Sequence, residues 1–193
     1  MFGPGENDST CTASLGVHPG EAAGPVSAIT VLIAATPDGA LNLSYRIHGD
    51  FDRVRVPAKA AARISERLWE RTCCELFVRA VGVPAYHELN FSPSSEWTAY
   101  AFTRYREGRL LADEALDPQI TTRHTSGVLE LCARIPLARL SRYYEGATLA
   151  LGISAVIEGS DGTRSHWALV HPADKPDFHH PDAFAFRLNA LRH

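Results

Sequence analysis

Alternating apolar and polar side chains over residues 41–47 constrain the fold more than any other feature of the sequence. Leu41, Leu43, Tyr45 and Ile47 alternate with polar residues. A period of two places every second side chain on the same face of a strand, so one face of this strand is predicted to be buried. An apolar run precedes it at residues 29–35, and Pro37-Asp38-Gly39 between the two runs is typical of a turn. We therefore predict a β-hairpin.

The same kind of short segment recurs along the rest of the chain. Further strands are predicted at residues 73–79, 86–92, 97–104, 128–135, 148–157, 164–170 and 184–188. Turn sequences such as Gly159-Ser160-Asp161-Gly162 separate them. Helical spacing is clearest at residues 58–68, which follow Pro57. Nine or ten short strands with this punctuation predict an all-β fold, an antiparallel β-sandwich.

The first 25 residues differ in composition from the remainder. Gly, Pro, Ser, Thr and acidic residues dominate them, so we expect a disordered tail followed by one domain over residues 26–193. They lack the basic start and apolar stretch of a secretory signal. With four cysteines and no CxxC pair, the chain is expected to be a cytoplasmic protein with reduced thiols.

Charge and hydropathy exclude two classes of partner. The net charge is −3 and no cluster of arginines stands out, whereas binding to nucleic acid would need a basic stripe. No segment approaches the roughly 20 apolar residues that span a bilayer. We expect neither nucleic-acid nor membrane partners.

Motifs for catalysis are few. The chain contains no Gly-rich phosphate loop, no GxSxG and no HExxH. Glu75 and Glu88 could form a carboxylate pair on neighbouring strands, since paired carboxylates share acid and base work in some hydrolases. Residues 166–180 hold four histidines and two aspartates, a composition that would suit a transition metal. The alternatives are that the two glutamates are surface charges of a sheet, and that the histidines bond to loop carbonyls.

The three tryptophans each adjoin polar residues, which is common for half-exposed rings. An exposed indole can stack on the apolar face of a sugar ring while polar groups around it bind the hydroxyls. Packing in the sandwich core is the alternative. For Trp97 the sequence favours core packing. For Trp69 and Trp167, stacking on a ligand and packing in the core are about equally favoured.

Three segments, in this order and spacing, resemble one family. They are LWERTCCELFV at residues 68–78, YHELNFSPSSEW at residues 86–97, and HWALVHPADKPDFHHPDAFAFRL at residues 166–188. Together they resemble the DOMON-like proteins related to family 9 carbohydrate-binding modules, and the resemblance spans most of residues 28–188. It implies an antiparallel β-sandwich, in agreement with the strand pattern.

The resemblance also implies roles for individual residues. Trp69 falls at the tryptophan that stacks on sugar, Glu75 at the glutamate that accepts hydrogen bonds from hydroxyls, and Asn90 at the family's asparagine in the Asn-x-x-Pro turn, written here NFSP. Trp167 is the nearest candidate for a second stacking ring. Some DOMON relatives bind haem through a methionine and a histidine, but the only methionine here is Met1. We therefore expect no haem and no other cofactor.

We interpret the chain as a non-catalytic domain that binds a carbohydrate or a sugar-containing metabolite. The predicted ligand-binding residues are Trp69 and Trp167 for stacking, Glu75, Arg79 and Asn90 for polar contacts, and His87 and His171 at the rim. Two other classes stay open: a metal-binding protein or metal-dependent enzyme that uses residues 166–180, and a domain that binds another protein.

Overall fold

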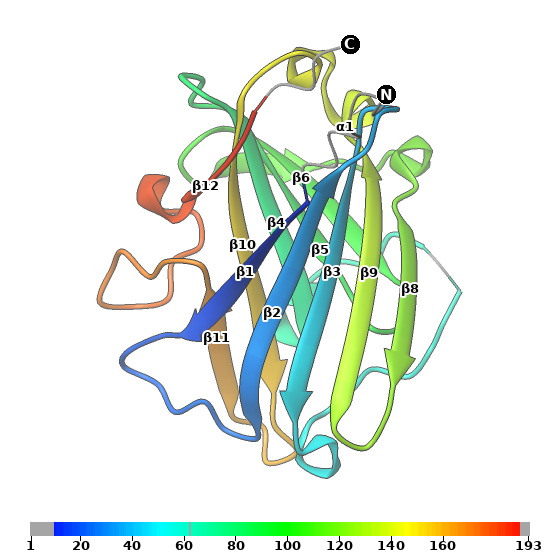
Figure 1. Cartoon of the computed structure of the whole chain (residues 1–193), viewed down its shortest axis with the longest axis vertical. Coiled ribbons are helices and arrows are strands. Elements are labelled where there is room, and N and C mark those ends of the chain that lie inside the picture. Colours follow the sequence, from blue (N-terminus) through cyan, green and yellow to red (C-terminus); the bar gives the residue numbers. More distant parts are fainter. Residues whose placement is uncertain (1–9, 62, 190–193) are drawn as a thin grey trace, which may run out of the picture.

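The computed structural model describes residues 10–61 and 63–189, and these residues form a two-sheet antiparallel β-sandwich (Figure 1). The predicted fold class is therefore confirmed. The strands are β1 (Thr10–Val17), β2 (Val26–Ala35), β3 (Ala40–Gly49), β4 (Cys73–Ala80), β5 (Tyr86–Phe91), β6 (Trp97–Arg104), β7 (Glu107–Leu110), β8 (Gln119–His124), β9 (Val128–Pro136), β10 (Leu149–Glu158), β11 (Arg164–Ala168) and β12 (Phe186–Leu188).

Helical segments are short. One α-helical turn, α1, spans Leu137–Leu140, and five 3₁₀ turns cover η1 (Phe51–Arg53), η2 (Leu68–Glu70), η3 (Glu114–Leu116), η4 (Arg142–Tyr144) and η5 (Pro181–Ala183). The helix predicted at residues 58–68 is wrong. Up to residue 67 its described residues are irregular apart from a bridge between Ile64 and Trp97, and Leu68 begins η2. Backbone bonds from Ser65 and Trp97 tie this segment to the start of β6 instead.

The strands fall into two groups. Sheet A has the order β1-β2-β3-β9-β8, and sheet B has the order β7-β6-β5-β4-β10-β11, with β12 paired to β10. β1 joins them: residues 10–15 pair with β2, and Gly16 and Val17 pair with β11. Figure 1 shows β1 running obliquely between these two neighbours.

This strand corrects the prediction of a disordered tail over residues 1–25. The part up to residue 9 lies outside the described residues, but residues 10–15 of β1 pair with β2, and Leu15 and His18 are buried. The composition of the segment is polar because most of β1 lies at the surface. Backbone pairing, which composition does not report, holds it in place.

The core lies between the two sheets and follows the predicted alternation. Leu41, Leu43, Tyr45 and Ile47 of β3 all point into it. From sheet B, Leu76 and Val78 pack against them. Sheet B is unusual because its central strand β10 is buried along its whole length. The outer face of this strand is therefore covered as well. The segment that covers it is the loop between β11 and β12, which also lines the candidate site.

Among the described residues, no helix is long and apolar enough to cross a membrane.

Candidate binding site

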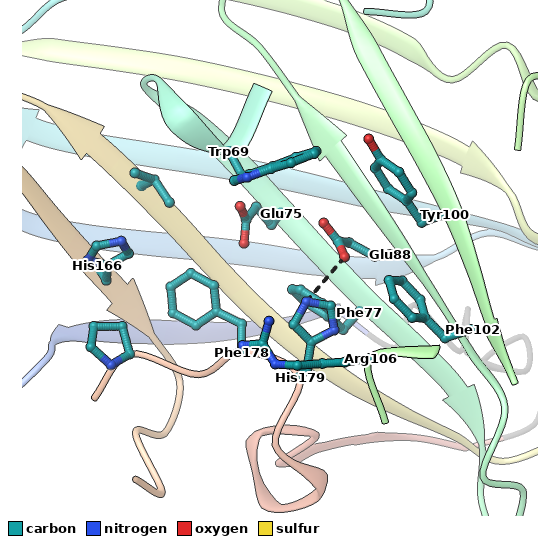
Figure 2. Close-up of a pocket in the computed structure, with 12 residues that line it drawn as sticks. Trp69, Glu75, Phe77, Glu88, Tyr100, Phe102, Arg106, His166, Phe178 and His179 are labelled. Atoms are coloured by element: carbon teal, nitrogen blue, oxygen red, sulfur yellow. Dashed lines mark ion pairs between the residues drawn. The ribbon is translucent and has the colours of Figure 1, made fainter. Parts of the chain in front are cut away.

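A cavity of about 330 Å³ lies on the outer face of sheet B (Figure 2). Strands β4, β5 and β6 form its floor, η2 and the β6–β7 turn flank it, and the loop between β11 and β12 closes it from the other side. The lining residues are Trp69, Glu75, Phe77, Glu88, Tyr100, Phe102, Arg106, Val156, His166, Pro176, Phe178 and His179. The loop at residues 169–185 therefore covers the outer face of β4 and β10.

Two glutamates lie at the floor of this cavity. Glu75 of β4 is opposite Asn90 of β5, and Phe77 is opposite Glu88. The two carboxyl groups are therefore diagonal neighbours on one face, a relation that puts Cβ atoms roughly 7–8 Å apart or somewhat less. Both side chains are buried, with 2% and 6% of their surface exposed.

The partners of both carboxyls are mostly neutral. Ser154 Oγ donates to Glu75 Oε2 at 2.9 Å, and Cys73 Sγ approaches Glu75 Oε1 at 3.6 Å. The Asn90 side-chain amide donates to Glu88 Oε1 at 2.8 Å. Burial raises the pKa of Glu75, and the neighbouring charge of Glu88 raises it further. Burial also raises the pKa of Glu88, although the Asn90 hydrogen bond and Arg106 act in the opposite direction. The pair therefore retains protons at pH values where exposed carboxyls have lost them.

His179 lies against Glu88 but does not neutralise it. The distance from His179 Nε2 to Glu88 Oε2 is 3.6 Å (Figure 2), which would suit an ion pair. Burial and the charge of Arg106, however, lower the pKa of His179 to about 4. The imidazole of His179 is therefore neutral at neutral pH, and its contact with Glu88 is a polar contact and not an ion pair. The Tyr86 hydroxyl accepts from the Arg106 backbone N–H at 3.1 Å and lies within hydrogen-bond distance, 2.9 Å, of His179 Nδ1.

Aromatic rings make the walls. Trp69 lies in η2, which begins directly after Arg67, a residue with a left-handed backbone (φ of 60°). Trp69 is 36% exposed. It meets the Tyr100 ring edge to face at 5.6 Å between centroids. On the loop side, Phe178 packs near Phe77 at 6.4 Å. Figure 2 shows Glu75 and Glu88 between the indole and this loop.

Arg106 fixes the loop against the β6–β7 turn. Its Nη2 donates to Asp177 Oδ1 at 2.8 Å, and the Tyr105 hydroxyl donates to Asp177 Oδ2 at 2.7 Å. Asp177 in turn accepts from the backbone N–H of His179 at 3.2 Å. These contacts hold the loop residues that line the cavity.

The structure brings together only part of the predicted site. Trp69 and Glu75 line the same cavity. Asn90 is fully buried beside them and orients Glu88.

Trp167 was wrongly predicted as a stacking ring. It is 4% exposed and belongs to the core between the sheets, where its Nε1 donates to Ser165 Oγ at 3.0 Å. The alternation of β11 puts His166 on the cavity side and therefore Trp167 on the opposite side.

Three further residues predicted at the site lie elsewhere. Arg79 shares the face of Glu75, but it extends over the Phe184 ring at 4.4 Å and donates to the Pro181 carbonyl. His87 lies on the other face of β5, with Nδ1 2.6 Å from the Tyr144 hydroxyl. His171 packs behind the lining residue Phe178 and does not line the cavity itself, and its Nε2 lies 2.9 Å from the Gly16 carbonyl oxygen.

Several residues that line the cavity are not among the ligand-binding residues predicted from the sequence. Glu88 was considered only as half of a carboxylate pair, and Tyr100, Arg106, Phe178 and His179 were not predicted. The period of two carried a signal for the first two, because Glu88 and Tyr100 are opposite each other on β5 and β6. The loop residues gave no such signal, since their position depends on tertiary contacts.

The four histidines of residues 166–180 contact different partners. His166 Nδ1 bonds to Glu21 at 2.9 Å, His171 to Gly16, His179 to Tyr86, and His180 Nδ1 accepts from the Asp182 backbone. Within residues 10–61 and 63–189, no group of three His, Cys, Asp or Glu side chains is placed to hold a metal ion. The metal alternative thus gains no geometric support.

The similarity to known proteins is confined to structure. No protein-family model matches the chain, and no curated protein is significantly similar in sequence. A crystal structure from Bacteroides uniformis, of a protein provisionally described as carbohydrate-binding, superposes with a TM-score of 0.68 at 17% identity. The match covers 90% of this chain and 83% of the other. The chain shares this fold.

Two structures of a family 9 carbohydrate-binding module from Caldicellulosiruptor kristjanssonii are more distant. The complex with cellotriose gives a TM-score of 0.49 at 11% identity, covering 91% of this chain and 77% of the other. The complex with glucose gives 0.39 at 14% identity, covering 76% and 65%. Scores below 0.5 add nothing to the fold assignment.

Proposed function

We propose that the chain binds a small carbohydrate in the cavity on the outer face of sheet B and performs no chemistry on it. One observation carries this proposal: a half-exposed indole, Trp69, stands over two buried carboxyl groups, Glu75 and Glu88, in one cavity. An aromatic plane and hydrogen-bonding groups set at its edge are the two elements that a sugar ring requires.

The size and walls of the cavity agree with a small ligand. A volume of about 330 Å³ lies at the lower end of the range for small-molecule sites. The rings of Trp69 and Tyr100 offer apolar surface, and Ser154 and Asn90 keep the carboxyl groups oriented. A site whose polar groups are held before the ligand arrives loses less conformational entropy on binding.

The fold similarity supports the same class of ligand. The Bacteroides uniformis protein with this fold is provisionally described as carbohydrate-binding. Because a fold hosts many functions, that likeness adds to the site and does not replace it.

Binding to another protein has less support. Large exposed apolar side chains among the described residues are few and scattered: Leu32, Trp69, Val81, Val83, Tyr105, Tyr143 and Val170. A docking surface would more often present a contiguous patch.

Tryptophan fluorescence offers a direct test. Trp97 and Trp167 are buried at 3% and 4% exposure, so Trp69 is the tryptophan that a ligand would reach. Titration with a panel of mono- and disaccharides should give a saturable change in emission, confirmed by calorimetry. Trp69→Ala should abolish it. Tyr143→Ala, which removes a ring that is 72% exposed outside the cavity, should not.

Glu75→Gln provides the polar counterpart. At a pH at which Glu75 is ionised, it should weaken sugar binding by about 1.5–3 kcal/mol, the scale of a hydrogen bond to a charged group. If no sugar in the panel binds with a Kd below about 10 mM, a binding free energy of roughly −3 kcal/mol, the proposed function is wrong.

A further inference from the structure

Each of the potentially cationic side chains at the rim of the cavity already has its own carboxylate. Arg106 Nη2 lies 2.8 Å from Asp177, and His166 Nδ1 lies 2.9 Å from Glu21. Both Glu21 and Asp177 are outside the set of lining residues. These two pairs therefore engage both groups with carboxylates outside the floor, although the charge of Arg106 still acts on Glu88 at longer range.

The side chains that donate hydrogen bonds to the floor carboxyls are all neutral. Ser154 of β10, Cys73 of β4 and Asn90 of β5 supply their hydrogen bonds. Two other titratable groups face them. His179 of the loop is neutral at pH 7, because its pKa is lowered to about 4. Tyr100 of β6 keeps its proton, because burial and the charge of Glu88 raise its pKa to about 12.

A third acceptor adds to this imbalance. Asn90 is fully buried and points from the same face of sheet B as Glu75 and Glu88, two residues along β5 from the latter. Its Nδ2 donates to Glu88, but its Oδ1 has no hydrogen-bond partner. A buried acceptor without a donor is costly, so a ligand that brings N–H donors to this face of the sheet would supply what Asn90 Oδ1 lacks.

The walls favour a cation for an independent reason. Five aromatic rings line the cavity: Trp69, Phe77, Tyr100, Phe102 and Phe178. The face of an aromatic ring is electronegative and attracts an ammonium group, most strongly where water is displaced. Acceptors at the floor and aromatic rings around them are complementary to a compact positive charge with several N–H donors.

We propose that the cavity selects a ligand bearing a protonated amine, and, given the sugar binding proposed above, that this ligand is an amino sugar. The ammonium group supplies up to three donors to Glu75 and Glu88. A neutral sugar offers hydroxyl donors but leaves the charge of an ionised carboxylate without compensation.

Calorimetric titration of the wild-type protein with glucosamine and glucose tests this, since the two differ by one ammonium group in place of a hydroxyl. N-acetylglucosamine adds a neutral derivative at the same carbon. We expect glucosamine to bind at least about 10-fold more tightly than either, because charge-assisted hydrogen bonds are the stronger ones. Glucose binding without this preference would overturn the inference and leave sugar binding intact. Failure of all three while another sugar of the panel binds would overturn the inference alone, and failure of the whole panel would overturn both.

Proton release gives a second measurement that needs no variant. At about pH 6 an aliphatic amine is protonated, and the two floor carboxyls still hold protons. Binding an ammonium favours their ionised forms, so titration in two buffers of different ionisation enthalpy should show net proton release for glucosamine. Affinity for glucosamine should rise with pH over the range from about 5 to 6.5. Proton uptake, or no proton change, would overturn the inference.

The double variant Glu75→Gln/Glu88→Gln assigns the effect to these groups. It keeps the shape of both side chains and removes both carboxyls, so the ratio of the two affinities should fall to about one. Glu130→Gln, which removes a carboxylate paired with Arg46 on sheet A, should keep the ratio. Circular dichroism checks that the double variant is folded, and a persistent preference for glucosamine in it would contradict the assignment.

Discussion

Glu75→Gln should change how stability depends on pH, because this carboxyl is buried without a cationic partner. Its pKa in the folded chain is raised above the ordinary 4.5, first by burial and then by the charge of Glu88. At pH values above about 4.5, the folded chain therefore holds a proton that the unfolded chain has released. The sign follows directly: the free energy of unfolding falls as the pH rises through this interval.

The magnitude comes from the same linkage. One proton held only by the folded chain changes the free energy of unfolding by about 1.4 kcal/mol per pH unit. Between about pH 5 and pH 7, Glu75 should therefore cost the wild type up to about 2–3 kcal/mol. A glutamine at this position has no such proton. The variant should lose that much less stability over the interval, and at pH 7 it should equal or exceed the wild type.

The wild-type curve by itself would mislead. His179 has its pKa lowered to about 4 by burial and by Arg106, so its contribution to stability is lost as the pH falls from about 6.5 towards 4. This slope is opposite to that of Glu75, and Glu88, whose pKa is also raised by burial, adds a slope of the same sign as Glu75. The wild-type curve is therefore the sum of three overlapping groups. Only the difference between the wild type and Glu75→Gln isolates the carboxyl.

Urea unfolding at several pH values between about 5 and 8, with a constant m-value, measures this difference. Glu130→Gln serves as the matched control, because it removes a partly exposed carboxylate from the ion pair with Arg46 on sheet A. Its difference from the wild type should stay within about 0.5 kcal/mol at each pH. A gap between Glu75→Gln and the wild type that does not change with pH would refute the reasoning.

Three further outcomes test the packing. Deleting residues 1–18 should lower the melting temperature, because β1 pairs with β2 and β11; an unchanged melting temperature would support a dispensable tail. Trp167→Ala should lower the free energy of unfolding by about 3–5 kcal/mol, and Trp69→Ala by less than half as much, since its ring is 36% exposed; equal losses in denaturant unfolding would place both rings in the core. Tyr144→Phe removes the hydroxyl that donates to the Val78 carbonyl at 2.8 Å and should cost about 1–3 kcal/mol by the same measurement, whereas no loss would show that the bond contributes nothing.

Local patterns determined most of the strands. The alternation over residues 41–47 is β3, and residues 97–104 form β6 at the predicted bounds. These segments could be read directly because a period of two is built into the geometry of a strand that buries one face. β1 and β8 could not, since most of β1 and four of the six residues of β8 are exposed and backbone pairing holds them in place. The helical spacing at residues 58–68 was likewise overruled by contacts with β6.

Within the candidate site, the sequence determined which side chains share a strand face, and the tertiary structure decided what that face meets. Glu75 and Phe77 had to point the same way. That Glu88 lies diagonally across from Glu75 depends on the register between β4 and β5, and a shift of one residue would turn it to the opposite face. Whether Trp167 faces ligand or core depends on how β11 joins β10. The loop that brings Phe178 and His179 over the carboxyls is held by Arg106 and Asp177, 71 residues apart in the chain. Their contact exists only once the strands of sheet B have paired, because no local periodicity specifies a meeting between distant loops.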